Sequence, residues 1–303
     1  MAEPPAPALI DFVGEHGPVE AAERVQRAEC PPAVLEETTG RRKHDNAKRD
    51  LARATAAEAR LVTPEDDEWP AWPLLSMAVA RDRGVSGMAP PLALWVRGPE
   101  RLDEAVNQAI AIVGARAATG YGEHNAAELG YHLADQGVPV FSGAAYGIDG
   151  AAHRGALNTN GTTVAVLGCG IDVAYPAAHT ALLHRIAKTG ALVSEYPPGT
   201  SPARHRFLVR NRLLAALTTA TVVVEAGRRS SALNTAETAC ALGKVVTAMP
   251  GPVSSAMSAG CHALIREGKA TLVSSVADLL DTAALSVNAP GKPAAVDDAL
   301  PNA

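Results

Sequence analysis

Between about residue 93 and residue 280, short runs of β-branched and apolar residues alternate with segments of helical periodicity. Such alternation is typical of strands joined by right-handed helical crossovers, which produce a parallel sheet. The strand-like runs are continuously apolar, which indicates a sheet covered by helices on both faces. We therefore expect an α/β fold with an extended Rossmann-like, doubly wound and mostly parallel sheet. Strands are expected at Leu94–Val96, Ile110–Val113, Val138–Phe141, Thr163–Leu167, Leu192–Ser194, Thr221–Val224, Val245–Ala248 and Thr271–Val273, and helices at Glu123–Gln136, Ala177–Lys188, Phe207–Leu217, Ala232–Leu242 and Ser258–Arg266.

The chain before this alternation has a different texture. Apolar residues at helical spacing and a charged run over residues 41–60 predict a small N-terminal helical region, residues 1–68. Pro70 and Pro73 argue against regular helix around residues 66–73, so residues 69–92 are expected to be a connector pinned by Trp69 and Trp72. The Rossmann-like domain is expected over residues 93–285. Residues 286–303 are expected to be a flexible tail, and no winged-helix domain is expected.

Composition excludes several classes of protein. The chain has 303 residues, a net charge of −5 and 47% hydrophobic residues, which is ample for a core. It contains no apolar run near the ~18 residues of a membrane span, and no secretory signal is visible. The four cysteines are isolated and have no zinc-site spacing. We expect a cytoplasmic protein without a metal, a cofactor or a membrane contact.

Glycine-rich loops follow three of the expected strands. They begin at Gly114, at Ser142-Gly143 with Gly147 close behind, and at Gly168. Ligands of doubly wound sheets bind beyond the carboxyl ends of the strands, where glycines let backbone N–H groups approach an anion. A fourth loop carries Ser230 and leads into the helix with Thr235, where hydroxyl and N–H groups can also meet an anion. The pattern predicts an anion pocket.

Known catalytic and nucleotide-binding patterns are missing. Gly114 is followed by Arg116 where a dinucleotide fingerprint needs a second glycine, and no P-loop sequence occurs. Asp149 and His153 would share a helix face, and we interpret them as a helix cap and a packed histidine in preference to a catalytic pair. No base–nucleophile pair is visible, so no catalytic residue is assigned.

An arginine-rich segment opens the helix expected at 207–217. Residues 204–212 hold four arginines, a histidine and one of only three phenylalanines in an acidic chain. Guanidinium groups fit phosphate oxygens, and an aromatic ring offers a stacking surface to a base. We predict that Phe207 stacks on a base and that Asn211 lies beside it in the site. Phosphate contacts are predicted from Arg206, Arg210 and Arg212 of this segment and from Arg116, which follows the strand expected at Ile110–Val113.

An ordered series of motifs between about residues 69 and 280 resembles the DprA (Smf) family of bacterial DNA-processing proteins. The series is Val113-Gly114-x-Arg116, Ser142-Gly143-x-Ala145-x-Gly147-Ile148-Asp149, Ala152-His153, Gly168-x-Gly170-x-Asp172, Tyr175-Pro176, Glu195-x-Pro197-Pro198-Gly199, Phe207-x-x-Arg210-Asn211-Arg212, Val224-Glu225-Ala226, Pro250-Gly251 and Gly260-Cys261-His262-x-Leu264-Ile265. Ala115, Ser231 and Lys269 depart from the family's usual residues.

The resemblance implies a function and two partners. It implies a single-stranded DNA-binding protein that protects incoming DNA, loads the RecA recombinase during natural transformation and is not an enzyme. It also implies a homodimer, with positions matching His262 and Ile265 in the surface used for self-association and for RecA. Leu272, on the last expected strand, lies close behind this apolar segment in the sequence. Either Leu264 or Ile265 is expected to pack inward.

An enzyme is the alternative. A similar Rossmann variant serves nucleotide phosphoribohydrolases that resemble the lysine-decarboxylase-like family, in which a glutamate acts on the sugar. The equivalent loop here, which begins at Glu225, lacks the glycine series of those enzymes.

Overall fold

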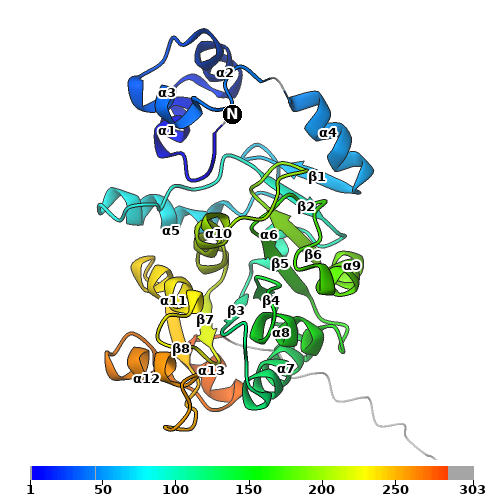
Figure 1. Cartoon of the computed structure of the whole chain (residues 1–303), viewed down its shortest axis with the longest axis vertical. Coiled ribbons are helices and arrows are strands. Elements are labelled where there is room, and N and C mark those ends of the chain that lie inside the picture. Colours follow the sequence, from blue (N-terminus) through cyan, green and yellow to red (C-terminus); the bar gives the residue numbers. More distant parts are fainter. Residues whose placement is uncertain (1, 45, 286–303) are drawn as a thin grey trace, which may run out of the picture.

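The computed structural model describes residues 2–44 and 46–285, and this part of the chain contains one sheet of nine strands. The strand order is β1-β2-β6-β5-β4-β3-β7-β8-β9, and the strands from β1 to β8 are labelled in Figure 1. All neighbours from β6 to β9 pair in parallel, and β1 and β2 add an antiparallel edge. The fold class expected from the sequence is confirmed. The strands are β1 (Ala59–Val62), β2 (Leu94–Arg97), β3 (Ile110–Val113), β4 (Val140–Ser142), β5 (Thr163–Leu167), β6 (Ala191–Ser194), β7 (Ala220–Val223), β8 (Val245–Ala248) and β9 (Thr271–Leu272).

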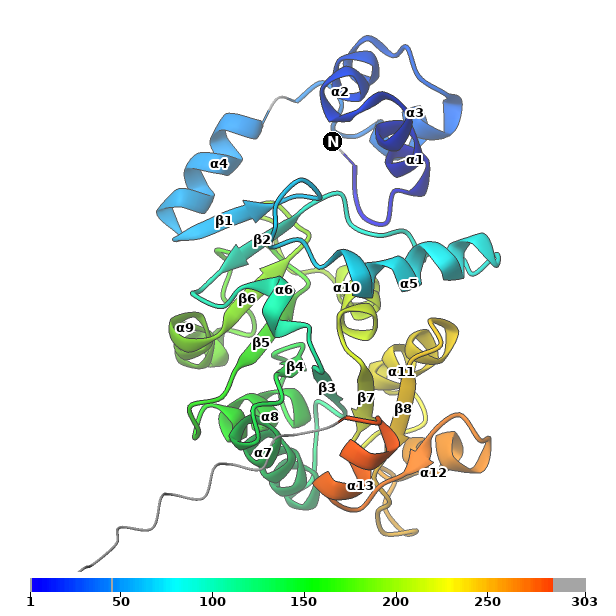
Figure 2. The ribbon, with the colours of Figure 1, turned by 180° about the vertical axis from the view of Figure 1, so that it is seen from behind.

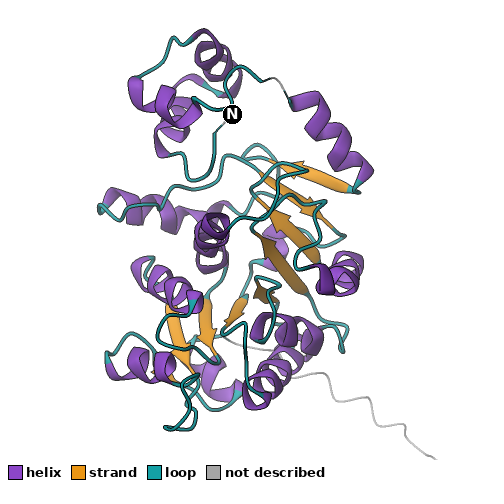
Figure 3. Ribbon diagram, in the orientation of Figure 1, coloured by secondary structure: helices purple, strands orange, loops and turns teal. Residues whose placement is uncertain are grey.

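Helices cover both faces of the sheet (Figure 3). Successive strand residues point to opposite faces, so Phe141 packs in one hydrophobic cluster and its neighbour Val140 in another. The Phe141 face is covered by α5 (Ala71–Asp82), α6 (Leu102–Ala105), α10 (Arg204–Leu217), α11 (Ser231–Ala241) and α12 (Ala259–Arg266). The opposite face is covered by α7 (Gly120–Asp135), α8 (Ile148–Ala156), α9 (Thr180–Thr189), which the short 3-10 turn Ala177–His179 precedes, and α13 (Val276–Thr282).

The N-terminal helices build a core of their own. Helices α1 (Pro7–His16), α2 (Pro18–Arg27) and α3 (Pro32–Thr38) each start with proline, whose missing N–H is not needed in a first turn. Phe12, Val25 and Val34 are buried among them, in a cluster separate from those of the sheet. Helix α4 (Ala47–Ala56) lies apart from this cluster, next to β1, in both views (Figures 1 and 2).

Two expectations for the region before residue 93 are wrong in detail. Residues 59–62 form a strand in place of the expected helix, because they pair with β2 and because Arg60 binds Glu68 and the carbonyl of Gly98. The expected connector contains α5, since Pro73 falls in its first turn, where proline is tolerated. Trp72 is 84% exposed and therefore pins nothing. The tail expected at 286–303 lies outside the described residues.

Candidate nucleic-acid interface

The loops after β3, β4 and β7 meet beyond the carboxyl ends of these strands, a place that is called the Arg116 edge below. Strand β3 lies between β4 and β7, so the chain runs outward from it in both directions. Such a reversal of strand order is where open α/β sheets bind ligands, beyond the carboxyl ends of the strands. Arg116, which follows β3, lines one hollow together with Gly143 and Gly168, which follow β4 and β5. It lines another hollow together with Ser230, which follows β7, so the predicted loops do come together.

Arg116 and two aromatic rings form the exposed part of this edge. The Arg116 guanidinium carbon lies 5.4 Å from the centroid of the Phe207 ring. Phe207 in turn stacks on Tyr175, with centroids 5.2 Å apart and an interplanar angle of 25°. Arg116 is exposed and makes no ion pair within the described residues, so its charge is available to a ligand.

A shallow hollow of about 630 Å³ continues from Arg116 and Phe207 over the start of α11. Two further arginines line it, Arg204 at the start of α10 and Arg229 in the loop before α11. Neither arginine forms an ion pair within residues 2–44 and 46–285. The surface around Arg116 is therefore locally cationic although the chain as a whole is acidic.

Arg210 lies beneath this surface and is almost fully buried. Its guanidinium donates to the Val166 carbonyl oxygen at the end of β5. The site has no room for another side chain there, because a Cβ on Gly143 would lie 2.1 Å from Arg210 Nη1. Gly143 therefore serves to admit a guanidinium, and Arg210 gives the floor of the pocket a positive charge.

Asp149, in the first turn of α8, provides part of the compensating charge. Burial raises the pKa of its carboxyl, although the charge of Arg210 and N–H groups of Ala145 and Gly143 act in the opposite direction. Burial likewise lowers the pKa of Arg210, and the charge of Asp149 opposes this. Gly147 is the residue before α8, so the interpretation of Asp149 as the helix cap is replaced by a role beside Arg210.

The other expected glycine ligands are explained by packing. A Cβ on Gly114 would lie 2.5 Å from the Ile148 side chain. Gly147 has a φ of +67°, which favours glycine, and a Cβ there would lie 2.3 Å from the Ala115 carbonyl oxygen. These glycines bring the loops after β3 and β4 into contact, and they shape the pocket from behind.

Comparison with known proteins identifies the family of this chain. The family model described as DNA recombination-mediator protein A matches residues 60–284. The chain belongs to this family. A DprA of Mycobacterium tuberculosis is 54% identical over 281 residues, which cover 93% of this chain and 72% of that protein. A DprA of Streptococcus pneumoniae is 40% identical over 190 residues, 63% of this chain and 66% of that protein.

Two solved DprA structures share the fold. The structure from Streptococcus pneumoniae has a TM-score of 0.73 at 32% identity and covers 90% of this chain and 92% of its own. The structure from Helicobacter pylori has a TM-score of 0.58 at 28% identity and covers 64% of this chain and 87% of its own. The latter is described as showing the single-stranded DNA binding mode of that protein.

Two arginines of the predicted phosphate-binding set are engaged by carboxylates. Arg212 and Glu195 make two contacts of 2.8 Å, and their side chains are 4% and 8% exposed. The predicted phosphate contact from Arg212 is therefore replaced by a buried ion pair. Arg206 lies against Glu3, with 2.6 Å between Arg206 Nε and Glu3 Oε1.

Several polar residues of the predicted site hold elements together. The buried Ser142 hydroxyl donates to the Ile112 carbonyl oxygen at 2.6 Å, so this side chain does not reach a ligand. The side-chain amide of Asn211 lies 3.3 Å from Asn234 Oδ1, which links α10 to α11. Ser230 caps α11 by accepting from the Ala232 N–H, and Thr235 is buried behind it.

The two alternative catalytic candidates are also tied into the structure. His153 is fully buried, and its Nδ1 lies 2.8 Å from the Thr163 hydroxyl, which confirms the packed histidine. Burial lowers the pKa of His153 to about 3. Both carboxylate oxygens of Glu225 accept hydrogen bonds from Thr119, one from its N–H at 2.9 Å and one from its hydroxyl at 2.7 Å. Glu225 therefore fastens the loop between β3 and α7.

Sequence reasoning missed the tyrosines of the site. Tyr175 is 39% exposed, and Tyr146, whose ring edge meets His179, is 48% exposed. Aromatic residues make up only 4% of this chain, so tyrosines inside the glycine-loop motifs were a usable signal. Sequence reasoning also missed Arg229, for which the signal was the pair of adjacent arginines before α11.

The predicted self-association residues lie at the β9 end of the sheet. His262 Nε2 lies 3.0 Å from the Gly251 carbonyl oxygen, and Ile265 is half-buried against the core. Leu264 is buried, which confirms that one of this pair packs inward. Leu272 is 49% exposed on the edge strand β9.

Metal-binding clusters and membrane-spanning helices are both absent from the described part of the chain. No group of three or more metal-binding side chains occurs within residues 2–44 and 46–285. No helix in the same ranges is long and apolar enough to cross a membrane.

Proposed function

We propose that this recombination mediator binds single-stranded DNA at the edge defined by Arg116, Phe207 and Tyr175. The observation that carries the proposal is an unpaired guanidinium over a stacked aromatic pair, at the switch point of the sheet. Phosphate oxygens suit the guanidinium, and unpaired bases stack on exposed rings. Because Arg116 and Tyr175 already neighbour the Phe207 ring, a base is expected to extend the stack from Tyr175. Arg204 and Arg229 would continue the phosphate path.

Binding of oligo-dT at several salt concentrations tests this proposal. Arg116→Ala should weaken binding to all sequences alike and lower the salt slope by about 0.7, the contribution of one phosphate contact to a single strand. Tyr175→Ala should cost ~1–3 kcal/mol of binding free energy if a base stacks on it. Arg185→Ala removes the same charge from the exposed face of α9 and serves as the control. Unchanged affinity and slope in Arg116→Ala would contradict the proposal.

Single strands should also bind better than duplex. A paired base reaches the rings only after unstacking, which costs ~a few kcal/mol. Equal affinity for both forms in competition would place the DNA on another surface.

We infer that the protein performs no catalysis of its own. The glutamate on which the phosphoribohydrolase alternative depends, Glu225, has both oxygens bound by Thr119 and lies only 2% exposed. Release of free base from a nucleoside monophosphate, abolished by Glu225→Gln in a folded protein, would decide for that enzyme.

We further propose a homodimer that presents two such edges to one strand and delivers it to RecA. The family's description as a recombination mediator supports RecA as a partner. The surface of Leu272, His262 and Ile265 is the candidate for both contacts. Assembly of RecA from the same organism on coated single strands, with and without this protein, is the corresponding assay.

A further inference from the structure

A second group of cations lies at the seam between the N-terminal segment and α10. Arg41, His205 and Arg206 converge on the carboxylate of Glu3. Arg206 Nε lies 2.6 Å from Oε1 and Arg206 Nη2 lies 3.3 Å from Oε2. His205 Nε2 lies 3.4 Å from Oε1, and Arg41 donates to Oε2. Three side chains distant from Glu3 in the sequence thus share one oxyanion, so their arrangement is complementary to such a group.

Arg206 is held in place by more than Glu3. Its Nη1 donates to the Ser201 carbonyl oxygen at 2.5 Å, and its guanidinium carbon lies 5.4 Å from the Tyr196 ring centroid. The Arg206 side chain is 15% exposed, whereas Glu3 is 33% exposed. The fork is therefore preorganised, and the carboxylate that fills it is the more accessible partner.

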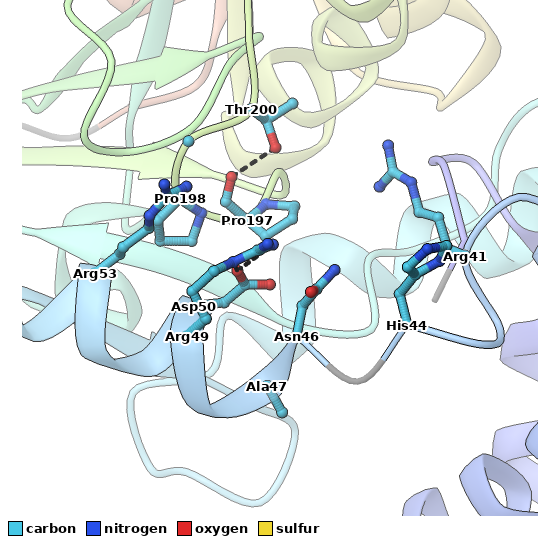
Figure 4. Close-up of a pocket in the computed structure, with 11 residues that line it drawn as sticks. Arg41, His44, Asn46, Ala47, Arg49, Asp50, Arg53, Pro197, Pro198 and Thr200 are labelled. Atoms are coloured by element: carbon cyan, nitrogen blue, oxygen red, sulfur yellow. Dashed lines mark hydrogen bonds and ion pairs between the residues drawn. The ribbon is translucent and has the colours of Figure 1, made fainter.

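The cationic surface continues beyond Arg41. Arg41 also lines a hollow of about 530 Å³ between α4 and the Pro197–Thr200 loop, together with His44, Arg49 and Arg53 (Figure 4). Arg49 pairs with Asp50, but Arg53 makes no ion pair within the described residues. An anion that leaves the seam in this direction meets further positive charge.

We propose that Arg41, His205 and Arg206 form a second phosphate-binding site for a single strand, and that Glu3 occupies this site until a strand displaces it. The proposal rests on the proposed function, because the second site would take the continuation of a strand held at Arg116 and Phe207. Arg206 and Phe207 both lie in the first turn of α10, so the two sites are at the same end of this helix. The carboxylate of Glu3 stands in for the oxygens of a phosphodiester, which match the same fork. The N-terminal segment is accordingly a built-in competitor of DNA.

The variant Glu3→Gln tests this proposal in the full-length chain, with any affinity tag at the C-terminus. It should bind long oligo-dT about two- to fivefold more tightly, which is the range of a partly exposed ion pair. Its salt slope should rise by about 0.7 for each additional phosphate that the freed cations neutralise. Arg41→Ala should weaken binding of the long strand, and Glu3→Gln should have a smaller effect in the Arg41→Ala background, because the two residues act on one site. Oligomers that fill only the Arg116 edge should not distinguish these variants.

Asp11→Asn provides the matched control. It breaks the 2.8 Å ion pair between Asp11 of α1 and Arg81 of α5, another contact of the N-terminal helices with the rest of the protein. An equal rise in affinity in Asp11→Asn would show that loosening these helices is the cause, and would overturn the second site.

Further outcomes separate this proposal from the proposed function. If Arg116→Ala abolishes binding while Glu3→Gln changes neither affinity nor slope, the second site is wrong and the proposed function stands. Inorganic phosphate can also be tested as a competitor of long oligo-dT for the Glu3→Gln protein. If it binds the freed cations as tightly as the strand does, the site takes free phosphate and the assignment to a strand is overturned. If the wild-type protein binds no single strand, both proposals fail.

Discussion

Arg212 shows how far a residue's role depends on a partner distant in the sequence. Its spacing from Phe207 placed it in the expected phosphate-binding set, but Glu195 at the end of β6 binds both arms of its fork. The same holds for Arg206 and Glu3. The arginine-rich motif predicted that cations gather here, and it could not predict which of them a carboxylate neutralises. Arg116, by contrast, was predicted from a loop position that the topology makes exposed.

The buried pair leads to a prediction at this scale. Glu195→Gln should destabilise the fold by about 3–5 kcal/mol, because it leaves the Arg212 charge buried without a counter-charge. Urea unfolding measures the loss. Glu58→Gln is the control, because it breaks the ion pair between Arg97 and Glu58, whose side chain is 86% exposed. Little change in the free energy of unfolding is expected from this substitution. A stable Glu195→Gln protein with altered DNA affinity would return Arg212 to the binding surface.

At the scale of elements, the strands of the parallel sheet could be predicted because each is a short, continuously apolar run between glycine or polar loops. Strand β1 could not, since Ala59–Val62 contains a charge and owes its state to pairing with β2 and to the bonds of Arg60. Helix α5 was missed because proline was read as a break where it is an initiator. The β1 error concerns contacts that local periodicity does not encode, whereas the α5 error concerns the position of a proline within its helix.

The short strand β9 carries the prediction for this scale. Leu272 is exposed on β9, which is an edge strand of the sheet that the described residues form, and proteins normally cover apolar groups at such an edge. Leu272→Glu should split the proposed homodimer into folded monomers, as measured by light scattering. Val19→Glu introduces the same charge at a 72% exposed position of α2 and should leave the mass unchanged. A dimer that survives Leu272→Glu forms through another surface.

At the scale of the whole molecule, the buried ring of His153 is expected to make stability depend on pH. Its Nε2 has no hydrogen-bond partner within the described residues, so protonation would bury an unpaired charge. The folded pKa is about 3, whereas the unfolded value is near 6.5, so below pH ~6.5 the unfolded state alone binds the proton. Stability should therefore fall on acidification between these values, by up to about 1.4 kcal/mol per pH unit. Comparing the pH dependence of unfolding in wild type and His153→Gln isolates this contribution.

The exposed His184 of α9 supplies the control substitution, His184→Gln. Identical pH slopes for wild type and His153→Gln would show that the buried ring does not govern acid stability.

The separate core of α1, α2 and α3 has a consequence for the evolution of the protein. Its buried side chains belong to none of the clusters under the sheet, and the ion pairs Glu3–Arg206 and Asp11–Arg81 join it to the remainder. A unit attached in this way can be lost, exchanged or duplicated by recombination between genes without opening a cavity beneath the sheet. Selection on such a unit then acts through charge at the seam, so its acidic positions are expected to covary with the arginines they meet.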